Sequence, residues 1–322
     1  MKSCLYPTNA HAARGGPACY PAPMRRMAWW WWVCLCACGP GGSPGGAARV
    51  AEAAVGHRVT ALALSDDGAR VAIGLDGALE TRGADLRQPQ SLAVGAGFIQ
   101  AVAFNAAGTM LFSGGQANGL TAWNTADGSR AGVLTDTVFP VRAVACSPAG
   151  LVVAALGDNT LRVFSPLQSE TRRWLQQAAA VRWWSDQEVV SGGADGLVRR
   201  FDPVTGNARG SFSAHLGGVL ALDVDAAAGR VASAGGDGLV RVSALDGTAV
   251  AQWDAAGIPV GVAFVDGDRV ACVVQEGALL VVPAAGGDAT RLDVGGALTA
   301  MAARGSHVFI GTLAGEVYRY DL

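Results

Sequence analysis

A short sequence pattern recurs seven times along this chain between Asp76 and Tyr320, at intervals of about 40 residues. Each copy holds an apolar strand, a turn with glycine and a carboxylate or its substitute, and a second strand that ends near an aromatic position. The clearest copies are residues 191–202 and 233–242. A period of this length is typical of a stacked or circular array, because one unit alone cannot bury its own hydrophobic surface. The repeat therefore narrows the fold more than any other feature of the sequence.

The strands of each repeat are apolar over nearly their whole length, as in residues 71–73 and 151–155. Such runs indicate strands that are buried on both faces. Turn-forming residues separate the strands, for example at 65–68 and 147–150. No stretch with helical periodicity is long enough to supply crossover helices, so the sheets must cover one another. We therefore predict an all-β fold, a seven-bladed β-propeller of four-stranded antiparallel sheets.

Two positions in the repeats carry a resemblance to a known family. An acid occupies the glycine turn in five repeats, namely Asp76, Asp158, Asp195, Asp237 and Glu276. Six residues after this turn position comes an aromatic residue in four repeats, namely Trp123, Phe164, Phe201 and Tyr320. His57 and His215 each lie before the first strand of a repeat. With these residues the chain resembles the WD40-repeat (WD-repeat) β-propeller family over residues 49 to 322.

The resemblance implies structural roles for these residues. In the family a His, a Ser or Thr, an Asp and a Trp form a hydrogen-bonded network inside a blade. The five turn acids are therefore expected to fix turns, and His57 and His215 to fix the starts of blades. The match is incomplete, because no repeat holds all four residues, and alanine replaces the acid at Ala117 and Ala314. Most blades are therefore expected to rely on apolar packing.

The resemblance also implies how the ring closes. The last repeat ends at Leu322, which leaves no room for its fourth strand, while residues 48–55 precede the first repeat without a partner. In WD-type rings the N-terminal strand completes the last blade, and we expect residues 48–55 to do so here. Truncation of the C-terminus would then remove the partner of that strand and expose an edge.

The segment before the repeats has the pattern of an export signal, a basic stretch followed by a short apolar run and small residues. Arg25 and Arg26 precede the apolar run over residues 28–38. This run is about half the ~20 residues that a membrane-spanning helix needs, so we do not expect a permanent span. A start of translation at Met24 or Met27 would remove the long stretch that precedes the basic residues.

The end of the apolar run resembles a bacterial lipobox, the site where a signal peptidase cuts before a lipidated cysteine. Leu35, Ala37 and Gly39 match its pattern around Cys38, whereas Cys36 and the four consecutive tryptophans at 29–32 depart from it. The resemblance implies that Cys38 becomes the diacylated N-terminal residue and anchors the protein to a membrane of the bacterial cell envelope. The alternatives are a secreted or periplasmic protein without the lipid, and a cytoplasmic protein.

The sequence thus divides into three parts. They are a signal peptide region over 1–38, a flexible Gly/Pro-rich tether over 39–47, and the seven-bladed WD-repeat propeller over 48–322. Within the propeller, Cys146 and Cys272 lie in apolar strands of different repeats. We expect both to be buried free thiols rather than a disulfide.

No pattern of residues points to a catalytic, metal or cofactor site. The histidines lie in different repeats without metal-ligand spacing. The G-x-S-x-G sequence over 41–45 has no strand before it and no helix after it, so it cannot form a nucleophile elbow. The formal net charge of −2 gives no electrostatic case for binding nucleic acid. We therefore predict no catalytic residue, no metal, no cofactor and no nucleic-acid partner.

The expected function is that of a non-enzymatic protein-interaction scaffold, a lipid-anchored envelope protein that binds an unidentified protein partner on a propeller face. One alternative is an envelope enzyme or ligand-binding propeller with a site at the mouth of the central channel, and another is a cytoplasmic WD-repeat scaffold. Fold alone does not decide among these functions. Acids, Arg and His gathered at the channel mouth would favour the enzyme, whereas a broad apolar face would favour the scaffold.

Overall fold

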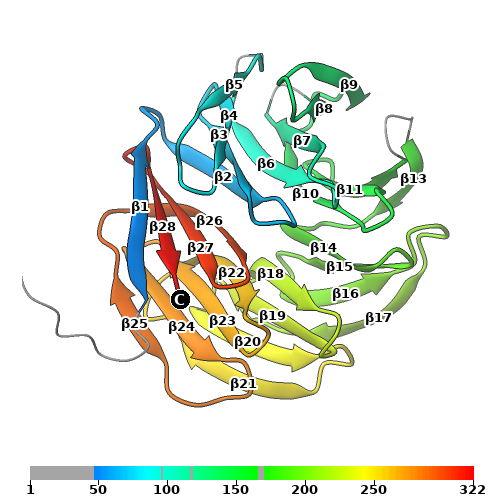
Figure 1. The fold of residues 1–322 in the computed structure, drawn as a ribbon. Coiled ribbons are helices and arrows are strands. Elements are labelled where there is room, and N and C mark those ends of the chain that lie inside the picture. Colours follow the sequence, from blue (N-terminus) through cyan, green and yellow to red (C-terminus); the bar gives the residue numbers. More distant parts are fainter. Residues whose placement is uncertain (1–46, 96, 117–118, 166–169) are drawn as a thin grey trace, which may run out of the picture. The chain divides into compact units, whose positions relative to one another are not determined.

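The computed structural model describes residues 47–322 except 96, 117–118 and 166–169, and these residues belong to one compact unit, Pro44–Leu322. The described residues form 28 strands and no helix. The strands build seven four-stranded antiparallel sheets that follow one another around a ring (Figure 1). This arrangement is a seven-bladed β-propeller, which confirms the fold class predicted from the repeat. The predicted signal peptide region and residues 39–46 of the predicted tether lie outside the described residues.

Six blades are each built from four consecutive strands, of which the first lines the central channel and the fourth lies at the outer rim. Blades 1 to 3 contain β2 (Val59–Leu64), β3 (Arg70–Leu75), β4 (Leu79–Gly83) and β5 (Gln90–Leu92); β6 (Ile99–Phe104), β7 (Met110–Gly115), β8 (Leu120–Asn124) and β9 (Arg130–Thr135); and β10 (Val141–Cys146), β11 (Val152–Leu156), β12 (Thr160–Phe164) and β13 (Glu170–Leu175). Blades 4 to 6 contain β14 (Ala180–Ser185), β15 (Glu188–Gly192), β16 (Leu197–Phe201) and β17 (Ala208–Ser213); β18 (Val219–Asp225), β19 (Arg230–Gly235), β20 (Leu239–Ala244) and β21 (Ala249–Asp254); and β22 (Pro259–Val265), β23 (Arg269–Val274), β24 (Ala278–Pro283) and β25 (Thr290–Asp293).

The seventh blade combines strands from both ends of the propeller. It contains, in the order of the sheet, β1 (Ala48–Ala54), β28 (Glu316–Asp321), β27 (His307–Thr312) and β26 (Leu298–Arg304). The strands β1 and β28 pair antiparallel along their length and lie side by side in Figure 1, in blue and red. The structure therefore confirms that an N-terminal strand completes the last blade and closes the ring.

Arg49 of β1 makes several contacts at this closure. Its guanidinium carbon lies 3.9 Å from the centre of the Tyr318 ring, a cation–π contact with β28. Its Nε donates a hydrogen bond to Tyr320 Oη (3.2 Å), and its Nη2 donates one to the carbonyl oxygen of Val294 (3.0 Å). Because Val294 follows the last strand of blade 6, Arg49 joins the closing strand to two blades.

The hydrophobic core lies between neighbouring blades, because each sheet covers the next with an apolar face. One cluster, for example, joins Val240 of β20 to Val270 of β23. The largest fully buried side chains include Phe112, Phe164 and Phe309. Burying one such side chain contributes about 1.5–3 kcal/mol to folding. The nearly continuous apolar strands of the repeat are thus explained by contacts on both faces of each blade.

A glycine near the end of the second strand lets neighbouring blades approach closely. A Cβ atom on Gly114 would lie 2.6 Å from Cβ of Val141, the first residue of the next inner strand. A Cβ atom on Gly74 would lie 2.8 Å from the side chain of Ile99 in the same way. Since Cβ atoms do not approach other carbon atoms so closely, only glycine fits without a shift of the blades.

Both cysteines of the propeller are free thiols, as predicted. Cys272 in β23 is fully buried, and Cys146 at the end of β10 is partly buried. Burial raises the pKa of both thiols, that of Cys272 to about 12. Both side chains are therefore protonated near neutral pH, and Cys272 acts as a small apolar group that fills space in the core.

Candidate binding face and central channel

The ring has two faces, and the turns that carry the predicted acids all lie on one of them. We call this the acid-turn face. It is formed by the turns between the second and third strands of each blade and by the connections from one blade to the next. The inner strand of each blade starts at this face, so the face also contains one mouth of the central channel. Loops held on a rigid frame are where binding residues are most often found.

In three consecutive blades the turn acid pairs with an arginine four residues later. The pairs are Asp158–Arg162, Asp195–Arg199 and Asp237–Arg241. The hydrogen bond from Arg199 holds the pKa of Asp195 below its usual range. Burial acts to raise the pKa of Asp158, but hydrogen bonds from Thr160 and Arg162 outweigh burial and lower it. These arginines were not among the predicted residues, although the repeated spacing Asp-x-x-x-Arg is a signal that could have found them.

Blade 5 brings a predicted histidine and a predicted acid together. His215 Nδ1 lies 2.8 Å from Asp237 Oδ1, and its Nε2 lies 2.9 Å from Ser233 Oγ. Burial lowers the pKa of His215, and Asp237 opposes this effect only in part. Burial acts to raise the pKa of Asp237, but hydrogen bonds from Arg241 and His215 outweigh it and lower that pKa. A neutral imidazole is therefore held between a hydroxyl and a carboxylate.

The same three residue types form catalytic triads in hydrolases, but the surroundings of this cluster do not suit catalysis. The His215 side chain is fully buried, and Ser233 is only 2% exposed. A nucleophile must reach a substrate, and Ser233 lies inside the second strand of a blade. The cluster joins the connection before blade 5 to the turn of that blade.

Blades 1 and 6 arrange their predicted residues differently. His57 is exposed, and its side chain makes no hydrogen bond within the described part of the chain. Asp76 is also exposed, and its backbone forms an isolated bridge with Phe98. Glu276 accepts a hydrogen bond from the backbone N–H of Ile258 (3.0 Å). The structure thus joins His215 to Asp237 but does not join His57 to Asp76.

Two turn acids hold connections that present apolar side chains to solvent. Asp237 Oδ2 accepts a hydrogen bond from the backbone N–H of Leu216 (3.2 Å), as Glu276 does from Ile258. Leu216 is 96% exposed and Ile258 is 49% exposed. The repeated acids therefore fix the backbone of loops whose outward side chains differ from blade to blade.

Exposed large apolar side chains are concentrated on the acid-turn face. Among the described residues, seven of them lie on this face or at its channel mouth: Val138, Phe139, Leu175, Leu216, Leu220, Ile258 and Leu313. Four lie elsewhere, on outer strands or on the opposite face: Val50, Val133, Val204 and Val250. A face that carries more of the exposed apolar side chains than the rest of the molecule is a candidate interaction surface.

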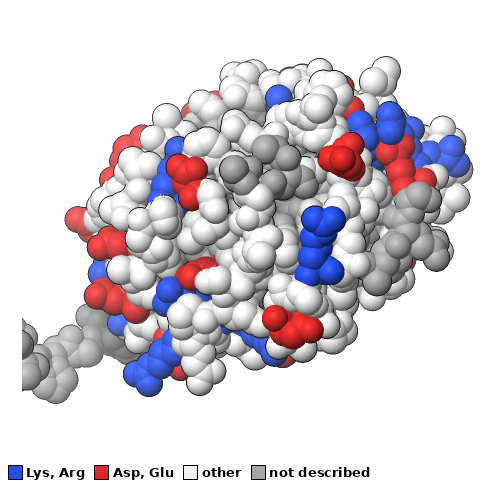
Figure 2. All heavy atoms as spheres, turned by 90° about the horizontal axis from the view of Figure 1, so that it is seen from above, with Lys and Arg blue, Asp and Glu red and all other residues white. Residues whose placement is uncertain are grey.

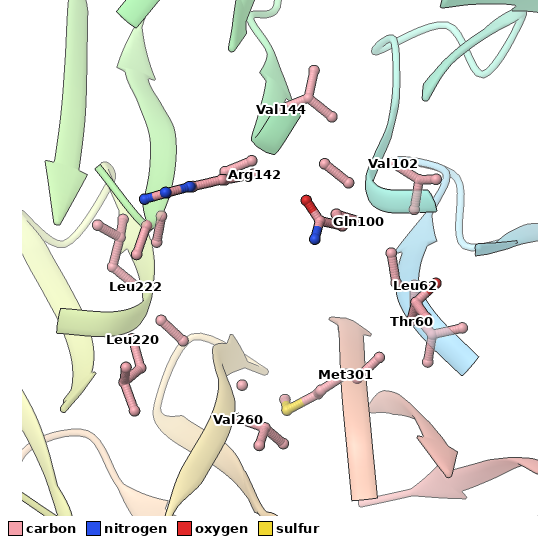
Figure 3. A pocket seen from close by; sticks show the side chains of 18 of the residues that line it. Thr60, Leu62, Gln100, Val102, Arg142, Val144, Leu220, Leu222, Val260 and Met301 are labelled. Atoms are coloured by element: carbon pink, nitrogen blue, oxygen red, sulfur yellow. The ribbon is translucent and has the colours of Figure 1, made fainter. Parts of the chain in front are cut away.

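The inner strands place a ring of variable side chains in the channel. In six blades the register shifts at the second residue of the inner strand, where a β-bulge leaves that residue unpaired and turns its side chain inward. The six residues are Thr60, Gln100, Arg142, Leu220, Val260 and Thr299. Figure 3 shows Arg142 and Gln100 reaching into the open centre, with Leu220 and Val260 on another side of it.

The channel opens at the acid-turn face. Its mouth has a volume of about 620 Å³, against about 200 Å³ for the middle. At the far end, with about 390 Å³, Arg182 Nε lies 3.2 Å from Asp223 Oδ1 of the neighbouring blade. The mouth and the middle share Thr60, Gln100 and Arg142 in their linings, so they form one continuous passage.

Other features of the described residues limit what this site can do. No group of three or more His, Cys, Asp or Glu side chains among them is placed to hold a metal ion. On the side drawn in Figure 2, acidic and basic side chains are interspersed and do not form a field of one sign. No helix within the described ranges has the length and apolar character needed to cross a membrane. The predicted lipidation site, Cys38, lies outside those ranges.

No protein-family model matches the chain, and no curated protein matches it.

Proposed function

We propose that this protein is a non-enzymatic interaction scaffold that binds a protein partner on the acid-turn face. The observation that carries the proposal is the concentration of exposed apolar side chains there, which include Leu216 and Ile258 on loops held by turn acids. A loop that is already ordered loses little conformational entropy on binding, so apolar anchors on it contribute more of their burial to affinity.

The alternative of an enzyme with a site at the channel mouth has less support. The described residues that line the mouth are arginine, glutamine, threonine, phenylalanine and proline. Among these side chains there is no carboxylate or imidazole that could transfer a proton near neutral pH. The Ser233–His215–Asp237 cluster is buried away from the mouth, so it does not supply the missing groups.

Site-specific photocrosslinking in the native cell tests the scaffold. A photoreactive amino acid at Leu216 or at Ile258 is expected to give the same discrete protein adduct. The matched control is Val204, which is 69% exposed but lies in a turn on the opposite face. With the probe at Ile258, Leu216→Asp is expected to lower the adduct yield about tenfold, since burying an unpaired carboxylate against an apolar partner costs affinity. Equal adducts from all three positions would contradict the proposal.

We also propose that the scaffold is anchored in a bacterial envelope by a lipid on Cys38. The support is the lipobox-like sequence over 35–38 and the Gly/Pro-rich tether that follows it. Metabolic labelling with a fatty acid and fractionation are expected to give labelled wild-type protein in the membrane fraction and unlabelled Cys38→Ala protein. Wild-type protein that is soluble and unlabelled would overturn the anchor and favour the secreted, periplasmic or cytoplasmic alternative.

A further inference from the structure

The ring of bulged residues at the channel mouth is polar on one side and apolar on the other. Thr299, Thr60, Gln100 and Arg142 come from four consecutive blades, counted from blade 7 through blade 1 to blade 3. Blades 5 and 6 contribute leucine and valine at the same position. A ligand that passes through the mouth to this ring would thus meet hydrogen-bond donors and a cation on one side and apolar surface on the other.

The two arginines of the mouth have no partner among the described residues, unlike most arginines of the propeller. Arg162, Arg199 and Arg241, for example, each pair with a turn acid. Arg58 and Arg142 are exposed, line the mouth, and make no ion pair or side-chain hydrogen bond within the described part of the chain. No carboxylate is among the described residues of that lining. No ion pair among the described residues neutralises these two charges, although the exposed Asp76 is a neighbour of Arg58, its backbone N–H bonded to the carbonyl oxygen of Arg58 (3.2 Å).

We infer that the channel mouth binds a carboxylate side chain of the partner protein, an inference that rests on the proposed scaffold function. A guanidinium matches a carboxylate in shape and can donate two parallel hydrogen bonds to it. Arg142 supplies this group, and the amide of Gln100, which lines the same cavity, supplies a further donor. Arg58 at the rim adds attraction over a longer range.

The small middle of the channel limits how far a ligand can enter beyond the mouth. The middle of the channel has about 200 Å³, which is less than the ~300–1,000 Å³ of ordinary small-molecule pockets. Inward from the bulged ring it is lined by apolar residues that include Leu62, Val102, Leu222 and Met301. A carboxylate would lose its hydration there without gaining a partner, so it stops at the level of Arg142.

The same charges exclude competing groups. A lysine or arginine of a partner would meet two guanidinium groups and no acid among the described residues that line the mouth, so cationic segments are rejected by like-charge repulsion. Neighbouring residues of an acidic segment can rest on the apolar anchors of the acid-turn face, such as Leu216. The charge of the mouth therefore selects acidic segments of a partner, and the apolar anchors supply buried contact area around the mouth.

Titration of the purified full-length protein with small probes tests the site without knowledge of the partner. The probes are N-acetyl-glutamate N-methylamide and its glutamine analogue, and the readout is the Nε–Hε resonances of ¹⁵N-labelled arginines, assigned by Arg→Lys substitution. The Arg58 and Arg142 resonances are expected to shift saturably with the glutamate probe at concentrations up to about 50 mM. The glutamine probe is expected to bind at least about tenfold more weakly, because it lacks the charge.

Arg142→Gln is expected to abolish the saturable shift at Arg58, whereas Arg130→Gln leaves it unchanged. Arg130 is the matched control, because it is exposed and also unpaired within the described ranges but lies on outer strand β9. Equal binding of both probes, or no saturable shift, would overturn the inference. Tighter binding of inorganic phosphate than of the glutamate probe would overturn the carboxylate assignment in favour of a phosphate group.

The two proposals fail in different ways. Adducts from Leu216 without probe binding at the mouth would leave the scaffold standing and overturn the carboxylate site. Probe binding without any adduct from Leu216 or Ile258 would overturn the scaffold, and with it the assignment of the carboxylate to a partner protein.

Discussion

At the scale of single residues, one repeat position shows that the effect of a buried hydroxyl group on stability depends on whether it has a hydrogen-bond partner. Ser113, Ser191 and Ser233 lie at equivalent places in the second strands of blades 2, 4 and 5, and all are buried. Ser113 accepts a hydrogen bond from Trp123 Nε1 (2.7 Å), and Ser233 bonds His215. Ser191 Oγ has no partner in the described structure. Two of the hydroxyls therefore stabilise their blades, and the third is a buried polar group without compensation.

This contrast predicts opposite effects of the same substitution. Ser233→Ala leaves a buried imidazole nitrogen without its partner and is expected to lower the free energy of unfolding by about 1–2 kcal/mol. Ser191→Ala removes an unsatisfied hydroxyl and is expected to leave stability unchanged or to raise it by up to about 1 kcal/mol. Denaturant unfolding measures both. A loss at Ser191 as large as that at Ser233 would show that Ser191 Oγ has a partner, for example an ordered water.

The burial of His215 predicts a loss of stability in mild acid. Its folded-state pKa is lowered from 6.5, so below that pH the unfolded chain takes up a proton that the folded chain does not. The stabilisation is complete above the unfolded pKa and is lost as the pH falls toward the folded one. Unfolding measured at several pH values is expected to show this slope in wild-type protein and a reduced slope in His215→Gln. Val204→Ala, at an exposed residue that does not titrate, is expected to keep the wild-type slope; equal slopes in all three would refute the assignment.

At the scale of elements, the contact between one blade and the next sets the repeat. The first residue of an inner strand packs against a glycine near the end of the second strand of the preceding blade, as Val141 does against Gly114. The residue that follows in the inner strand is bulged and turns into the channel. The first residue of each inner strand thus packs between blades, and the second is free to vary. The side chains around the channel therefore differ from blade to blade, although the fold is regular.

Gly114→Ala tests the contact between blades. The new Cβ would lie within 3 Å of Val141, so the blades must shift, and the expected cost is about 1–3 kcal/mol in denaturant unfolding. Gly132→Ala is the matched control in the same blade, since a Cβ there meets nothing within 4 Å. That variant is expected to change stability by no more than about 0.5 kcal/mol. A similar loss in both would mean that the close approach is not what selects glycine.

At the scale of the whole molecule, the repeat period predicted the seven blades, because a ring buries apolar strands that no single unit can cover. The closing strand was implied by the resemblance to WD-type rings. The exposed apolar face and the asymmetric mouth could not be predicted in the same way. They depend on single residues such as Leu216, Arg142 and Gln100, which do not recur from repeat to repeat. The sequence does not show which of these residues are exposed or line the same cavity. The pairing of turn acids with arginines was visible in the spacing. The exposure of His57 was not, since its repeat holds the acid Asp76 but the structure does not join the two.

Because β1 completes the last blade, the stability of the ring depends on its pairing with β28. A substitution of Arg49 in β1 tests this dependence. Arg49→Ala removes a cation–π contact with Tyr318 and two hydrogen bonds, and is expected to cost about 1–2 kcal/mol. Because β28 would become a poorly protected edge, its amide hydrogens and those of β1 are expected to exchange faster. Arg130→Ala, on the outer strand of blade 2, is expected to change neither quantity. If β28 exchange were unaffected by Arg49→Ala, the closing strand would be held by backbone pairing and apolar contacts alone.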